Sequence, residues 1–367
     1  MATDNHPNAA KTLNFSWIGL GSPICYCWNP LNMSCSVNLP QPGQEVREFY
    51  SVKPHRIEPW GSSISGPRNV APMDVSPIIT LPPSDSDELA EICRRDLIMP
   101  RHIAAELGQS AVAAARAGVY QDSSGRPVVW RDAVKHAVAA RISLPHDHPL
   151  PPCRPPRHDS TIIQVANETT MVSAQRAQAQ GLNPLALNFA NGVNPGGGIL
   201  NGALAQEECL CRSSALYLTL EGDFMYEFHR SRPEPDSSDW CILSPSVPFF
   251  RHDDGSVLDK PWLLDVITCA APYAPKIGQP RSRKLLKSRI RRVLSIARVR
   301  GYESLILGAW GCGAFGNDPR HTALDFRDAL ENEFRGAFSH AFFAVTDWSR
   351  ERKFLGPFRD VFSTPQS

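Results

Sequence analysis

The alternation of short apolar runs with helical patterns is the feature that most constrains the fold of this chain. From Ser160 onward, apolar runs of strand length are separated by segments whose apolar residues have helical spacing. The strands expected on this basis are Thr161–Ala166, Leu185–Phe189, Cys241–Leu243, Leu263–Ala270, Ser304–Gly308 and Ala341–Val345. The expected helices are Thr170–Gln180, Gln206–Leu220, Lys284–Arg300 and Thr322–Phe334. Strands that alternate with helices predict an α/β sandwich with a largely internal sheet.

The chain before Ser160 has two parts of different character. Turn residues, many of them prolines, occur throughout residues 1–84 without sustained periodicity, which predicts a disordered N-terminal extension. Residues 85–157 predict a small helical subdomain and a proline-rich connector. Its expected elements are a helix capped by Asp87 that ends at Leu97, a helix from Pro100 to near Gly118, a strand Pro127–Trp130 and a helix Asp132–Arg141. Residues 158–350 then form the main domain, and residues 351–367 a C-terminal tail.

Composition excludes several classes of protein. The 38 basic and 37 acidic side chains give a net charge of +1, whereas nucleic-acid binding through bulk charge needs a far more basic chain. No apolar run approaches the roughly 18 residues that span a membrane, and Met1–Lys11 lacks a signal-peptide layout. The 10 cysteines include no CxxC pair, so we expect buried thiols and no metal site. These features predict a monomeric intracellular protein, nuclear or cytoplasmic, without membrane or direct nucleic-acid contacts.

A triple glycine follows the strand predicted at Leu185–Phe189. Gly196, Gly197 and Gly198 let the backbone approach a ligand closely and leave N–H groups unobstructed. Such groups of N–H donors bind phosphate, although a flexible loop or a tight turn is the alternative reading.

A second glycine-rich segment runs from Gly308 to Pro319, after the strand predicted at Ser304–Gly308. Asp318 as N-cap and Pro319 at the first helical position predict a helix start there. The glycines formally match a dinucleotide-binding fingerprint, but that motif normally opens its domain, and only 51 residues remain after Gly316. A second phosphate-binding loop, with Phe315 as a stacking surface, fits better.

Two adjacent carboxylates, Glu207 and Glu208, stand close to the triple glycine. Gln206 opens their helix, and seven residues separate it from the third glycine. Solvated glutamates are common at a helix start, because anions suit a helix N-terminus. So near a phosphate site, however, two carboxylates would repel a diphosphate unless they served another part of the ligand.

These motifs together resemble the poly(ADP-ribose) glycohydrolases. Three glycines, a short spacer and Gln-Glu-Glu are the family's signature, and LNFANGVNPGGGILNGALAQEECLCRSSALY resembles its microbial-type branch. The segments VANETT, SPSVPFFR, TCAAPY and GAWGCGAFGNDP resemble it as well, in order between about Asp85 and Trp348. The resemblance implies a macrodomain-like three-layer α/β/α sandwich with a mixed sheet, and ADP-ribose in a cleft at the strand ends. Ile199 departs from the pattern, since phenylalanine often follows the triple glycine, and Asn191 stands where serine is common.

The resemblance also implies a role for each site residue. Glu208 would be the general acid/base, and Glu207 would position the ribose. Gly196, Gly197 and Gly198 would hold the diphosphate, with Gly311, Gly313 and Ala314 as the facing phosphate loop. Phe315 would lie against the distal ribose, and Asn191 or Asn194 would hold its hydroxyls. Gln206 completes the expected substrate-binding set, and the scheme requires no cofactor and no metal.

The expected reaction is hydrolysis of the O-glycosidic ribose–ribose bonds of poly(ADP-ribose), with release of ADP-ribose. Glu208 would protonate the departing oxygen and then activate water. A hydrolase of mono(ADP-ribosyl) groups on protein or nucleic acid is one alternative. A non-catalytic ADP-ribose reader is another, although binding alone has no need of an acid/base. The partner is poly(ADP-ribose) or an ADP-ribosylated protein. The nine basic residues of Arg281–Arg300 either contact polymer phosphates or form a solvated helix face.

Overall fold

An eight-stranded sheet organises residues 76–152 and 155–363, which the computed structural model describes. The strands are β1 (Ile78–Thr80), β4 (Ile142–Leu144), β5 (Thr161–Ala166), β6 (Pro184–Ala190), β7 (Cys241–Arg251), β8 (Val257–Ala270), β9 (Ser304–Leu307) and β10 (His340–Ala344). Their order is β1-β5-β10-β9-β6-β8-β7-β4. Neighbours from β1 to β8 are parallel, whereas β7 is antiparallel to both β8 and β4. The sheet is therefore mixed, as expected.

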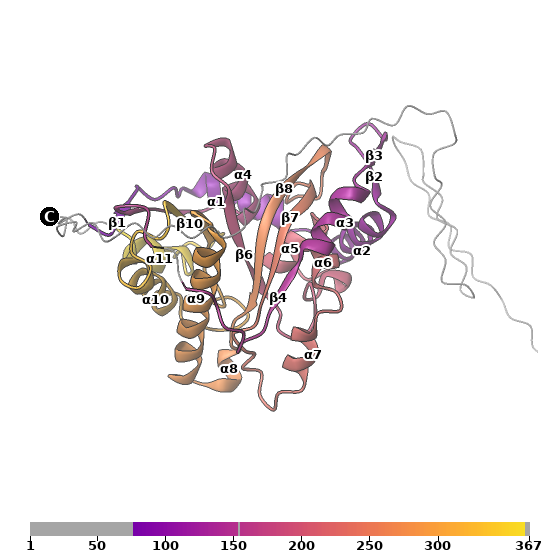
Figure 1. The fold of residues 1–367 in the computed structure, drawn as a ribbon. Coiled ribbons are helices and arrows are strands. Elements are labelled where there is room, and N and C mark those ends of the chain that lie inside the picture. Colours follow the sequence, from indigo (N-terminus) through magenta and orange to yellow (C-terminus); the bar gives the residue numbers. More distant parts are fainter. Residues whose placement is uncertain (1–75, 153–154, 364–367) are drawn as a thin grey trace, which may run out of the picture. The chain divides into compact units, whose positions relative to one another are not determined.

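Helices cover both faces of this sheet. Successive side chains of a strand point to opposite faces, so Leu185 and Leu187 of β6 join one core and Ala186 joins the other. On the first face pack α9 (Arg281–Arg300), α10 (Pro319–Glu331) and α11 (Leu355–Val361). On the second pack α4 (Thr170–Ala179), α5 (Gln206–Arg212), α6 (Leu216–Leu220) and α7 (Phe224–Arg230). Figure 1 shows α9, α10 and α11 on one side of the sheet and α5, α6 and α7 on the other. This confirms the three-layer sandwich.

The remaining elements precede or connect these layers. They are α1 (Asp87–Leu97), α2 (Arg101–Ala117), β2 (Val119–Gln121), β3 (Pro127–Val129), α3 (Arg131–Ala140), the 3-10 turn η1 (Ile199–Asn201) and α8 (Ala274–Ile277). Tyr120 and Trp130 pack on Phe250 of β7, with ring centroids 5.0 and 4.7 Å away. The helices expected as a subdomain therefore pack directly on the sheet.

The domain boundary expected at Ser84 is wrong. β1 pairs in parallel with β5, and Ile78 is buried in the first core. The pairing continues through the N–H groups of Leu81 and Ser84, which donate to the carbonyls of Ile163 and Val165. The sheet thus begins within the segment that was expected to be disordered. The expectation of disorder for residues 1–75 lies outside the described residues.

The prediction of a C-terminal tail from residue 351 is also wrong for the described residues up to 363. Leu355, Phe358 and Val361 of α11 are buried in the core that contains α10. Residues 364–367 lie outside the described part of the chain.

The helix expected over Gln206–Leu220 is two helices, α5 and α6. The connecting residues bond to β7 instead of continuing the helix: Ala215 N–H donates to the Pro248 carbonyl, and Phe250 N–H donates to the Ser213 carbonyl. β7 and β8 are also longer than expected, because they continue as an antiparallel hairpin through prolines and charged residues.

Helix ends follow the expected chemistry with one exception. Asp318 accepts from His321 N–H at 2.8 Å, and Pro319 opens α10, as expected. Ser86 caps α1 in place of Asp87, since its Oγ accepts from Leu89 N–H at 3.1 Å.

The six cysteines found in the described residues are free and buried, as expected. Among the helices of residues 76–152 and 155–363, none combines the length and apolarity that crossing a membrane requires.

The basic face of α9 is largely neutralised by ion pairs. Arg283 pairs with Asp325, Lys287 pairs with Asp325 and Asp328, and Arg291 pairs with Glu333. The apolar stripe of the helix is buried, as expected. The structure therefore favours a solvated, ion-paired helix face over a polymer-binding one.

Candidate active site

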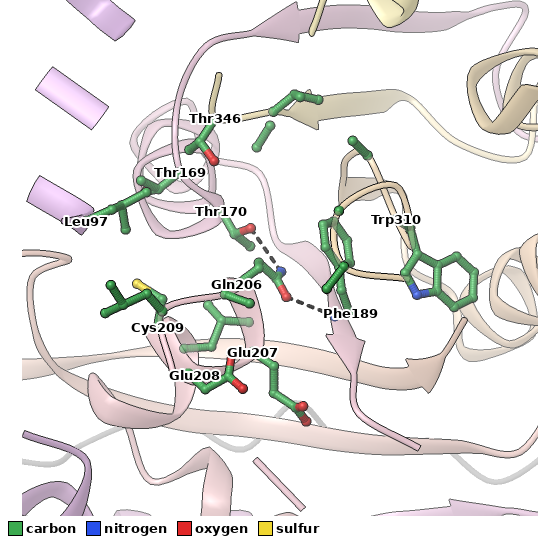
Figure 2. A pocket seen from close by; sticks show the side chains of 18 of the residues that line it. Leu97, Thr169, Thr170, Phe189, Gln206, Glu207, Glu208, Cys209, Trp310 and Thr346 are labelled. Carbon is green, nitrogen blue, oxygen red and sulfur yellow. Dashed lines mark hydrogen bonds between the residues drawn. The ribbon is translucent and has the colours of Figure 1, made fainter. Parts of the chain in front are cut away.

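One cavity of about 470 Å³ lies where several parallel strands end. It is lined by residues 168–171 after β5, 189–191 at the end of β6, 309–311 and 313–315 after β9, 344–346 and 348 at and after the end of β10, and 203–210 around the start of α5. Carboxyl ends of parallel strands meet at one edge of a sheet, where α/β proteins bind ligands. Figure 2 shows side chains from these separate segments around the same space. The volume lies within the roughly 300–1,000 Å³ typical of small-molecule sites.

Glu207 lies against the end of β6. Its side chain is buried, with Oε2 accepting from Asn191 N–H at 2.7 Å and Oε1 accepting from Asn188 Nδ2 at 3.2 Å. Burial raises the pKa of Glu207 to about 8, although these hydrogen bonds lower it, and the charge of Glu208 raises it further. The raised pKa favours the protonated form of Glu207, which carries no negative charge into the site.

Glu208 has one engaged and one unengaged oxygen. Oε1 accepts from Gly198 N–H at 2.8 Å. Oε2 is buried and has no hydrogen-bond partner among the described residues. Burying a polar atom without a partner costs free energy, so such atoms in native proteins commonly belong to functional groups. Glu208 also lines the cavity, and Oε2 is the oxygen of its carboxyl group that is free of a partner among the described residues.

The triple glycine makes room for these glutamates. Gly196 and Gly197 have φ of +66° and +58°, the left-handed region that glycine adopts without strain. A Cβ on Gly197 would overlap Glu208 Oε1, and a Cβ on Gly198 would lie 2.8 Å from Ala203 Cβ.

The amides of this turn are already used inside the protein. Gly198 N–H donates to Glu208, and Gly197 N–H donates to the carbonyl of Asn194. The cavity lining includes neither the three glycines nor Asn194, which is exposed. Their contact with a ligand therefore stays a prediction.

The second glycine-rich loop lines the cavity and has amides without an acceptor among the described residues. Gly311, Gly313, Ala314 and Phe315 all line the cavity. Their N–H groups donate to no described residue, whereas Asn317 N–H closes the loop by donating to the Gly311 carbonyl. Groups of free backbone N–H donors in one loop suit an anion. The structure thus brings the expected phosphate loop to the cavity.

Phe315 stands on the cavity wall. It is half-buried, and its ring meets Tyr273 edge-on with centroids 5.8 Å apart. Ala274 N–H donates to the Phe315 carbonyl, which fixes the backbone there. The ring therefore combines a packed edge with a surface that is open to the cavity.

Gln206 ties the start of α5 to the sheet. Its Oε1 accepts from Phe189 N–H at 2.9 Å, and its Nε2 donates to the Leu187 carbonyl and to Thr170 Oγ1 at 2.8 and 3.1 Å. Figure 2 shows these bonds to Phe189 and Thr170. Although Gln206 lines the cavity, its amide is used within the protein, so it positions the two glutamates that follow it. Its expected contact with substrate stays a prediction.

Asn191 uses its side-chain oxygen inside the protein. Its Oδ1 accepts from Val193 N–H at 2.9 Å and from Asn194 N–H at 3.0 Å. Since Asn191 lines the cavity and its oxygen is engaged, the side-chain NH₂ is the group left for a substrate hydroxyl.

Asp253 is a cavity residue that the sequence did not reveal. On the turn between β7 and β8, it accepts from Thr169 Oγ1 at 2.7 Å and from Cys209 Sγ at 2.9 Å. Burial raises its pKa. It joins the start of α4 to α5 beside Glu208. The available signal was its position two residues after the end of SPSVPFFR, a segment that carried the resemblance.

Comparisons with known proteins all lead to one family of enzymes. The family described as "Microbial-type PARG, catalytic domain" matches residues 108–252. The search of curated proteins returned no match. Poly(ADP-ribose) glycohydrolase from Thermomonospora curvata is 36% identical with a TM-score of 0.65, over 71% of this chain and 99% of that one. The structure of the same enzyme bound to the inhibitor ADP-HPD is 35% identical with a TM-score of 0.64, over the same shares of the two chains.

A third structure extends the likeness to a second organism. Poly(ADP-ribose) glycohydrolase from Deinococcus radiodurans, in complex with ADP-ribose, is 36% identical with a TM-score of 0.52. The match covers 68% of this chain and 96% of that one. At this identity and coverage, the chain belongs to the microbial-type poly(ADP-ribose) glycohydrolase family.

Proposed function

We propose that this protein hydrolyses the ribose–ribose O-glycosidic bonds of poly(ADP-ribose) and releases ADP-ribose. The observation that carries the proposal is Glu208, whose buried Oε2 has no partner among the described residues and whose side chain lines the cavity. The solved relatives support the substrate, since they are poly(ADP-ribose) glycohydrolases and one of them is bound to ADP-ribose.

Complementary groups in the cavity match the parts of ADP-ribose. The open amides of Gly311, Gly313, Ala314 and Phe315 suit the diphosphate. The NH₂ group of Asn191 suits a ribose hydroxyl, and the ring of Phe315 suits the apolar face of the same sugar. The protonated state of Glu207 limits repulsion between the site and the diphosphate.

The reaction needs one group that first gives and then takes a proton. Glu208 in its acid form donates the proton on Oε2 to the glycosidic oxygen, and the bond from that oxygen to the anomeric carbon breaks. Positive charge develops on the ribose, and the leaving sugar departs as an alcohol. Water then attacks the anomeric carbon while the Glu208 carboxylate takes its proton, which restores the acid.

Glu207 holds the geometry of this step. Its bond to Asn191 N–H joins α5 to the loop that carries the hydroxyl-binding amide. Glu207 and Gln206 therefore place the sugar and Glu208 relative to each other.

Incubation with two substrates tests the proposal. The protein is supplied with poly(ADP-ribose) and, separately, with mono-ADP-ribosylated protein, and products are identified by mass spectrometry. We expect free ADP-ribose from the polymer. Release from the mono-ADP-ribosylated protein alone would assign the chain to mono(ADP-ribosyl) hydrolysis. Calorimetric binding of ADP-ribose without release from either substrate would make the protein a reader.

A further inference from the structure

Two consecutive side chains of α7 hold the loop that follows the cavity residue Asn191. His229 Nδ1 lies 2.9 Å from the carbonyl oxygen of Gly192, and Arg230 Nη1 donates to the carbonyl of Val193 at 2.6 Å. His229 is 4% exposed, whereas Arg230 is exposed. We call His229 and Arg230 the α7 anchor. Neither residue lines the cavity.

The hydrogen bonds of His229 define its tautomer. Ser238 N–H, which can only donate, lies 3.1 Å from His229 Nε2. Nε2 is therefore the unprotonated nitrogen, and Nδ1 carries the hydrogen that is donated to the Gly192 carbonyl. Burial lowers the pKa of His229 to about 4, so the neutral ring persists at neutral pH.

The segment behind the ring is held in place as well. Arg232 makes two bonds of 2.7 Å to the Asp236 carboxylate, and buried Arg289 donates to the Asp236 carbonyl. Ser237 packs so closely that a Cβ on Gly192 would overlap its Oγ. The imidazole thus lies between a fixed segment and the loop that it holds.

Peptide geometry carries the effect of the anchor to the cavity. A trans peptide unit is planar, and its carbonyl and N–H point in opposite directions. The Gly192 carbonyl shares a peptide unit with Val193 N–H, and the Val193 carbonyl shares one with Asn194 N–H. These are the two N–H groups that hold Asn191 Oδ1, at 2.9 and 3.0 Å. Fixing the two carbonyls therefore fixes both donors to the Asn191 side chain.

We propose that His229 and Arg230 are positioning residues that orient the Asn191 amide toward a substrate hydroxyl through the peptide units of Gly192 and Val193. The inference rests on the proposed function only in naming the ligand as ADP-ribose. Asn191 also donates its own N–H to Glu207, so the same loop connects the anchor to the glutamate pair.

Two variants of His229 distinguish the contribution of Nδ1 from that of Nε2. Asparagine places an amino group near the position of Nδ1 and keeps the donor to Gly192, whereas glutamine reaches toward Ser238 and loses that donor. We expect His229→Gln to raise the KM for polymer and the Kd for ADP-ribose by roughly threefold to tenfold, the loss typical of one hydrogen bond. We expect His229→Asn to stay nearer to wild type in both. The kcat should change little in either variant, because a hydroxyl contact is made in the ground state and in the transition state.

Arg230→Ala tests the same inference if the variants of the buried histidine fail to fold. It should raise KM and Kd without lowering the melting temperature, because Arg230 is exposed. Arg131→Ala is the matched control, since Arg131 is an exposed arginine that donates to the Ala117 carbonyl at 3.1 Å and does not line the cavity.

Two results would overturn the inference. One is an ADP-ribose affinity for Arg230→Ala equal to that of the wild type. The other is equal impairment of His229→Asn and His229→Gln, which would show that the ring acts by packing alone. Wild-type protein that binds ADP-ribose but releases none from polymer would refute the proposed function, while the affinity measurements would still test the anchor.

Discussion

The triple-glycine turn has two roles: its backbone adopts a left-handed conformation, and it leaves room for Glu208. Replacing Gly197 by alanine tests whether the second role matters for catalysis. At φ +58° an alanine costs about 1–2 kcal/mol relative to an unstrained residue. Its Cβ would overlap Glu208 Oε1 and lie 3.0 Å from Glu208 Cδ, so the carboxyl group must move. That movement breaks the bond to Gly198 N–H, worth about 1 kcal/mol. The total loss of unfolding free energy is about 2–3 kcal/mol.

Turnover should fall further than this stability loss explains. Displacing an acid/base group by about 1 Å can cost about 10²-fold in rate. Gly181→Ala is the matched control, because Gly181 has φ +80° and no atom lies within 4 Å of an added Cβ. It should show a similar backbone cost and a wild-type rate. Polymer hydrolysis and thermal melting of both variants provide the comparison. A wild-type rate in Gly197→Ala, or an equal loss of rate in both variants, would refute the reasoning.

Three further outcomes follow from the same structure. Phe315→Ala should lower polymer turnover while the melting temperature changes little, because the ring is half-buried on the cavity wall; a collapse of the melting temperature would place it in the core. A chain that starts at Asp85 should be less stable than one that starts at Ser76 by about 2–3 kcal/mol, measured by denaturant unfolding, since it lacks the buried Ile78 and the β1 pairing. Between pH about 4.5 and 8, the folded protein holds a proton on Glu207 that the unfolded chain releases, so this group's contribution to stability declines as pH rises. Melting curves of Glu207→Gln across that range should decline less steeply than those of the wild type, and parallel curves would contradict the raised pKa.

Strands buried on both faces were predictable from the sequence. β5 matches its expected range, and β6, β9 and β10 lie within one residue of theirs at each end, because burial on two faces leaves continuous apolar runs. β1 was not predicted because it is only three residues long and is stabilised by pairing with β5. The paired residues Ile78 and Thr161 are 83 positions apart in the sequence. The break between α5 and α6 was not predicted either, because it is caused by hydrogen bonds to β7, which is distant in the sequence.

The site was predictable only where its chemistry is local in sequence. The triple glycine and the Glu207–Glu208 pair lie close together along the chain and also contact each other in the structure. Asp253 meets Thr169 across 84 positions, and no short-range pattern records such a contact. The engagement of the Gly198 amide was equally hidden, because its acceptor is the side chain of Glu208, 10 positions away.

Substitution of Glu208 by glutamine tests the central claim most directly. Glutamine keeps the size and polarity of the side chain but removes the transferable proton. Calorimetric titration with ADP-ribose is paired with a polymer-release assay on the variant and the wild type. The account predicts that ADP-ribose binding persists while hydrolysis drops by about 10²–10⁴-fold, the usual contribution of general acid–base catalysis. A Glu208→Gln variant that binds ADP-ribose and hydrolyses polymer at the wild-type rate would contradict the assignment of Glu208 as the acid/base.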